Sequence, residues 1–242
     1  MNCIQIKMIF ALCLSPLAAF TQAGDFKIDG KVNPKYNGAF VKLYISQNDS
    51  QIVDSFQVKK GIFKFQGKVS EPTLGTISMN KPGMGDCIAL FLSQGTVRVS
   101  TKDSLKNARI TGTKLAEEQD ILSKLMSDDE QKLSTMIQML SSMPDGPEKK
   151  AYIPDMLKAL KKLSVNRVST IHQFAKNHPD SYVTLYHLVN NVKNRSSSKS
   201  TTLPYFENLS EKLKETPVGK QFKKELLGIK LFEGKPYIDF AS

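Results

Sequence analysis

The sequence of 242 residues contains only three cysteines and three histidines, and it contains no tryptophan. Cys3 and Cys13 lie within residues 1–23, which have the layout of a cleaved targeting segment. The remaining chain then holds one thiol, Cys87, and cannot form an internal disulfide framework. A single thiol also lacks the second, resolving thiol that thiol–disulfide exchange needs.

The three histidines do not have the spacing of metal ligands. His172, His178 and His187 are separated by six and nine residues, whereas two ligands on one helix stand three or four apart. We expect His172 on a helix face and His178 at a helix end. No serine-nucleophile motif is present, and the Gly83-Met84-Gly85 stretch lacks the lysine of a phosphate loop. The sequence predicts no catalytic, cofactor-binding or metal-binding residue, and therefore no enzyme.

Acidic residues are also fewer than basic residues. Lysine and arginine exceed aspartate and glutamate by 34 − 23 = 11. The positive charges are scattered along the chain, and aromatic residues are not interleaved with them as base-stacking platforms would be. A solvated basic surface explains this pattern better than a nucleic-acid partner does.

Long apolar runs are absent except near the N-terminus. Met8–Phe20 is apolar but too short to span a bilayer comfortably, and Thr21-Gln22-Ala23 offers small residues before Gly24. Residues 1–23 therefore predict a cleaved signal peptide, with export to the periplasm or outer cell envelope and no remaining transmembrane anchor. A lipoprotein attached through Cys13 and a retained anchor are the alternatives.

Cys87 begins an apolar run, Cys87–Leu92. This context predicts a buried strand cysteine that acts as a small hydrophobe. A reactive thiol would need a neighbouring histidine or a helix N-terminus, and neither is visible in the local sequence.

Residues 24–112 have the texture of an antiparallel β-sandwich or open barrel of eight or nine short strands. The stretch Val53–Val69 predicts a hairpin around Lys59-Lys60-Gly61, where Gly61 supplies a positive φ. Alternation in its second strand places Phe63 and Phe65 on one face and lysines on the other. The other expected strands are 26–32, 40–45, 73–79, 87–92, 96–100 and 108–112.

Residues 113–233 predict a helical region, so the chain is of the α+β class. We expect separate helices over 114–126 and 128–140, a third that begins at Pro154, and a fourth over 182–192. Residues 195–202 are serine-rich and predict a loop, followed by helices over 204–214 and 217–232.

Several short motifs occur in a familiar order. Phe26-x-Ile28-x-Gly30-x-Val32 is followed by Gly61-x-Phe63-x-Phe65-x-Gly67-x-Val69, then by Phe91–Val99, Thr111-Gly112-Thr113 and His178–Ser181. The set resembles the N-terminal domain of unknown function in exported thiol–disulfide interchange proteins of Bacteroidetes, the thioredoxin-like proteins related to peroxiredoxins.

In such proteins a segment like Gly234–Phe240 leads into the thioredoxin-like domain. Residues 234–242 are therefore expected to be a tail that resembles the entry to such a domain, which is absent here. The resemblance implies an exported, non-catalytic binding or scaffold module whose partner is an envelope protein. The alternative is a subunit of a split oxidoreductase, with a separate thioredoxin-like chain as its partner.

Overall fold

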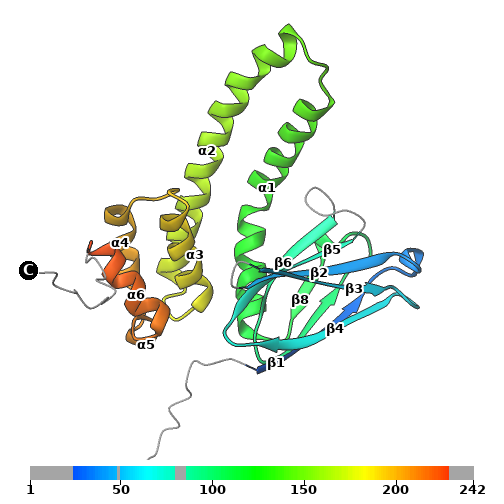
Figure 1. The fold of residues 1–242 in the computed structure, drawn as a ribbon, viewed down its shortest axis with the longest axis horizontal. Helices are drawn as coiled ribbons and strands as arrows, with labels where there is room; N and C mark the ends of the chain where they lie inside the picture. The colour runs from blue at the N-terminus through cyan, green and yellow to red at the C-terminus, as the bar shows by residue number, and fades with distance from the viewer. Residues whose placement is uncertain (1–23, 48–49, 80–85, 229–242) are drawn as a thin grey trace, which may run out of the picture.

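The computed structural model describes residues 24–47, 50–79 and 86–228. In this part of the chain, strands come first and helices follow (Figure 1). The predicted α+β class is confirmed. The predicted signal peptide, the Gly83-Met84-Gly85 stretch and the tail over 234–242 lie outside the described residues. The strands are β1 (Gly24–Lys31), β2 (Phe40–Gln47), β3 (Ser50–Gln57), β4 (Ile62–Val69), β5 (Thr73–Met79), β6 (Asp86–Leu92), β7 (Gly95–Ser100) and β8 (Arg109–Thr111).

The strands form two four-stranded sheets, with orders β4-β1-β7-β8 and β3-β2-β5-β6. Neither closes into a barrel, so the sandwich is the correct alternative. The pairing is not antiparallel throughout, because β1 and β7 run parallel with Ile28 opposite Val97. Strand β6 lies in the other sheet, so the chain crosses between the sheets before β7. Strand β7 then pairs with β1 and runs in the same direction.

The predicted hairpin over Val53–Val69 is wrong, although its turn forms. Lys60 and Gly61 have φ values of 53° and 70°, and Lys59 and Ile62 exchange both backbone hydrogen bonds. Beyond this turn the strands separate, because β3 pairs with β2 and β4 pairs with β1 in the other sheet. The turn is a corner between the two sheets, and partners distant in sequence complete each ladder.

The inward faces of the two sheets form the first hydrophobic core. Phe63 and Phe65 are buried there, as their alternation predicts, and Lys64 and Lys68 are exposed. The ring of Phe63 lies over Gly30, its cross-strand partner on β1. An alternating sequence thus gives β4 one buried and one solvated face.

The helices are α1 (Lys114–Ser142), α2 (Pro147–Asn177), α3 (Tyr182–Lys193), α4 (Lys199–Glu207), α5 (Glu211–Lys214) and α6 (Pro217–Leu226). α1 and α2 are a long antiparallel pair whose connecting turn extends away from the strands (Figure 1). α3 to α6 gather at the other end of α2. None of the helices in the described ranges has the length and apolar composition to cross a membrane.

The helix boundaries differ from the predictions in several places, and the helix expected over 204–214 is divided between α4 and α5. The expected helices over 114–126 and 128–140 are one helix, α1, since neither glycine nor proline interrupts residues 114–142. α2 begins at Pro147, so Pro154 lies inside it and removes one backbone donor without ending the helix. α4 begins within the predicted loop, where the Ser198 hydroxyl accepts a hydrogen bond from Thr201 N at 3.1 Å.

A second hydrophobic core joins the helices to the outer face of one sheet. Phe91 of β6 is fully buried in it. Its ring makes edge-to-face contacts with Tyr182 and Tyr186 of α3, at centroid distances of 6.1 and 5.1 Å. Leu90 and Leu92, on the opposite face of the same strand, belong to the first core. β6 therefore connects the two cores.

Candidate functional site

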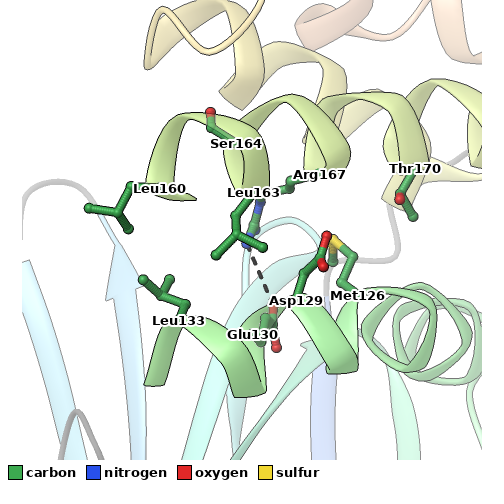
Figure 2. A pocket seen from close by; sticks show the side chains of 9 residues that line it. All are labelled: Met126, Asp129, Glu130, Leu133, Leu160, Leu163, Ser164, Arg167 and Thr170. Carbon is green, nitrogen blue, oxygen red and sulfur yellow. Dashed lines mark ion pairs between the residues drawn. The ribbon is translucent and has the colours of Figure 1, made fainter. Parts of the chain in front are cut away.

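A pocket of about 230 Å³ lies between α1 and α2. Figure 2 shows side chains from both helices converging on it. It is lined by Met126, Asp129, Glu130, Leu133, Leu160, Leu163, Ser164, Arg167 and Thr170. It is concave and largely apolar, and it also carries charged groups. Such sites are the default candidates for ligand binding.

The apolar walls follow from helical spacing. On α1, Met126 and Leu133 are seven residues apart and share a face. On α2, Leu160 and Leu163 turn toward them. In the described part of the chain, α1 and α2 pack on each other at this level, and the two helices leave these side chains incompletely enclosed. Met126 is buried, but the other three are only partly covered.

The polar wall is an ion pair between the two helices. Arg167 Nη1 lies 3.5 Å from Glu130 Oε1, and both side chains are about half exposed. Beside them, Asn166 Nδ2 donates to Asp129 Oδ2 at 3.0 Å. Desolvation raises the pKa of the Glu130 carboxyl, and the Arg167 charge opposes that rise. The pocket thus offers an apolar surface. At its edge lie one cation, Arg167, and one carboxyl group with a raised pKa, Glu130.

The opposite face of the same helix pair carries a larger hollow of about 510 Å³. Lys132 and Lys162 line it together with Thr135 and Asn166, and Met136 and Ala159 supply its apolar surface. Asp129 and Leu163 border both hollows. Because lysines and other polar side chains dominate this face, the first pocket is the stronger candidate for binding an apolar group.

Cys87 lies half-buried on β6. Burial is the main cause that raises the pKa of its thiol, and the charges of Asp86 and Glu130 raise it further. The fraction of thiolate, which is the nucleophile, is therefore reduced at neutral pH. The environment agrees with the hydrophobe predicted from the sequence rather than with a reactive thiol, although the side chain is less enclosed than expected.

The three histidines occupy separate environments. His172 is buried on α2 and stacks on Tyr205 with centroids 3.9 Å apart. His178 is the C-cap residue of α2, as predicted, and stacks on Phe174. His187 is buried on α3, and its Nε2 lies 2.9 Å from Gln119 Oε1. Within residues 24–47, 50–79 and 86–228, no group of three or more histidine, cysteine or acidic residues could hold a metal ion.

A row of buried polar contacts ties α1 to α3 below the pocket. The Ser181 hydroxyl donates to Glu118 Oε2 at 2.6 Å, and Lys114 Nζ lies 3.6 Å from the other oxygen of that carboxylate. The contact between His187 Nε2 and Gln119 Oε1 is a second tie between α1 and α3. These groups satisfy one another in the interior, so they hold α1 in place and present no free nucleophile.

Sequence reasoning missed the pocket residues. Met126, Glu130 and Leu133 have the i, i+4, i+7 spacing of one helix face. The predicted helix break between residues 126 and 128 divided this series and hid it. The partner face on α2 lay within the predicted third helix, but no local pattern showed that it meets α1.

Residues 26–119 match a family model described as "Domain of unknown function (DUF4369)". The chain therefore contains a domain of unknown function, made of the β-sandwich and the first residues of α1. The match does not assign the chain more narrowly than this. No curated protein and no solved structure matches the chain.

Proposed function

We propose that this protein is an exported, non-catalytic binding module of the type that precedes thioredoxin-like domains. It holds an apolar group of its partner in the pocket between α1 and α2. The pocket itself is the observation that carries the proposal: apolar side chains from two helices converge on an opening edged by Glu130 and Arg167. The order of sequence motifs supports the association with thiol–disulfide proteins.

Recognition at such a site combines apolar contact with charge. Leu133, Leu160 and Leu163 would lose exposed apolar surface on binding, which is worth about 25 cal/mol per Å². Arg167 would orient an anionic or carbonyl group at the edge, since guanidinium presents several donors in a plane. The raised pKa of Glu130 lowers the cost of bringing such a group beside it.

Photo-crosslinking in intact cells tests the proposal. A crosslinking amino acid replaces Ser164, an exposed residue of the pocket, and in a matched variant it replaces Lys161, an exposed α2 residue that does not line the pocket. We expect an adduct with another molecule from position 164 and none from position 161. No adduct at 164, the same adducts at both positions, or only adducts between two copies of this chain would contradict the proposal.

The identity of the adduct also separates the two forms of the proposal. A thioredoxin-like chain would indicate a subunit of a split oxidoreductase, and any other partner would indicate a stand-alone module. In either case the purified protein should not accelerate insulin reduction above the level of a Cys87→Ser variant. The reason is that the thiol pKa of Cys87 is raised and the mature chain offers it no second thiol.

A further inference from the structure

The outer part of the helix pair is under-packed. From residue 127 to residue 170 no side chain is buried, whereas Met126 and Ile171, on either side of this range, are. A helix in a folded protein is stabilised mainly by burying its apolar face. In the described part of the chain, the outer parts of the two helices pack on each other, and their apolar side chains remain partly exposed. An unpartnered face of this length calls for another layer.

One face of the pair, the pocket face, carries the apolar stripes. On α1 the stripe runs through Leu133, Ile137 and Leu140, and on α2 it runs through Ile153, Leu157 and Leu160. The steps of three and four residues keep each stripe on one side of its helix. Leu157 is 57% exposed, which is unusual for a leucine in the middle of an apolar stripe.

The apolar stripes of the two helices have their middle residues near one level. Contacts between Met139 and Tyr152, and between Glu130 and Arg167, fix the relative levels of the two helices. Ile137 and Leu157 lie between these contacts, near one level. A two-fold axis through that level would superpose the apolar stripes of two antiparallel copies, as an isologous interface requires.

The charges agree with this arrangement. Glu130 lies seven residues from Ile137 toward the strands, and Lys150 lies seven residues from Leu157 toward the connecting turn. At a rise of 1.5 Å per residue, both are about 10 Å from the axis, on opposite sides. In the antiparallel pair, Lys150 of one copy comes to the level of Glu130 of the other.

The available area is close to what a dimer needs. Residues 126–146 extend for about 30 Å, and two packed helices are about 20 Å wide. The resulting flat area of roughly 600 Å² approaches the roughly 800 Å² that each partner buries in a standard interface. A dissociation constant in the micromolar range is the expected strength.

We propose that two copies of this chain pair antiparallel through their pocket faces and form a four-helix bundle centred on Ile137 and Leu157. The pairing goes beyond the proposed binding role and uses the same face, so the second copy covers the pocket in the dimer and a partner binds the pocket of the monomer. A wild-type monomer would overturn the pairing and leave each chain's pocket in place, whereas a missing adduct at position 164 would overturn the binding role and leave the dimer.

Sedimentation equilibrium across the micromolar range tests the pairing. We expect a dimer for the wild type, a monomer for Leu157→Glu, and a dimer for the matched control Val165→Glu. Val165 is 62% exposed and lies next to Ser164 in sequence, so it points away from the pocket face. A monomeric wild type, or equal loss of the dimer in both variants, would overturn the proposal. Circular dichroism checks that each variant is folded.

A charge exchange tests the register and leaves the apolar side chains of both stripes in place. Glu130→Lys removes the ion pair with Arg167 of its own chain and should also weaken the dimer about tenfold, because it brings like charges to the same level of the two copies. Adding Lys150→Glu should restore most of the affinity, because the pair is then reversed. Failure of the second substitution to rescue the first would rule out this register. The two substitutions also decide the question if Leu157→Glu does not fold.

Discussion

His187 shows how burial sets the properties of single residues in this protein. The imidazole is enclosed on α3, and its Nε2 lies within hydrogen-bond distance of Gln119 Oε1, an acceptor that favours the tautomer with the proton on Nε2. Desolvation, with a smaller contribution from the Arg167 charge, lowers the pKa of His187 from 6.5 to about 4. The side chain is therefore neutral at physiological pH and acts as a polar tie between α1 and α3.

This lowered pKa predicts acid sensitivity. The unfolded chain binds a proton on His187 at a higher pH than the folded chain does. Above about pH 6.5 neither state binds it, and the full free energy of unfolding is present. As the pH falls from 6.5 toward 4, the free energy of unfolding decreases by about 3 kcal/mol in all. The free energy of unfolding, measured with denaturant at several pH values, should fall less steeply with acid in His187→Gln than in the wild type.

His178→Gln is the matched control, since His178 is only partly buried at the end of α2. It should keep the wild-type pH dependence. An unchanged acid response in His187→Gln would show that the histidine does not control stability in this range.

At the scale of secondary-structure elements, packing between neighbouring strands limits which side chains fit. Gly30 of β1 and Phe63 of β4 are cross-strand partners, and the Phe63 ring covers the backbone of Gly30. A Cβ at position 30 would lie 2.1 Å from Phe63 Cζ. The absence of a side chain at Gly30 thus makes room for the far end of the Phe63 ring.

Gly30→Ala should therefore destabilise the protein by about 1–3 kcal/mol through overpacking. In a Phe63→Leu background the cost of the same substitution should become clearly smaller, because the ring that it meets is gone. The double-mutant cycle is measured by chemical denaturation. Gly146→Ala is the control, since nothing lies within 4 Å of its added Cβ; it loses only the preference of the α2 N-cap for glycine over alanine, and its cost should not change in the Phe63→Leu background.

At the scale of the whole molecule, the sandwich and the helices share β6. Phe91 is buried among α3 tyrosines, while Leu90 and Leu92 are buried between the sheets. The two regions are therefore expected to unfold together, although their sequences have different textures. The match to the domain of unknown function also runs past the last strand into α1.

Phe91→Ala should cost about 3–5 kcal/mol and should loosen the coupling of the two regions. We expect amide exchange in α3 to rise more than amide exchange in β1 and β4, because the cavity opens on the helical side. Phe91→Leu, which keeps most of the volume, should retain a single transition. Equal acceleration in both regions of Phe91→Ala would show that β6 is not the junction.

The sequence by itself determined the class of fold, the alternation that buries Phe63 and Phe65, and the turn at Lys60-Gly61. These features depend on local rules: side-chain period, positive φ and helix-breaking residues. It also placed His178 at a helix end. Strand pairing was not determined in this way, because the turn before β4 is compatible with a hairpin and with a corner between sheets.

Only the tertiary structure decided which strands pair, that α1 is continuous, and that the pocket exists. β4 joins β1 because that pairing buries its phenylalanines between two sheets, which no local pattern can specify. Helix α1 continues past Ser127 because its lower part is anchored on β6 and α3 and its upper part lies along α2. The pocket requires Glu130 and Arg167, 37 residues apart in sequence, to meet across two helices. Their meeting depends on packing at a distance, and a single sequence records only the two helical stripes that make it possible.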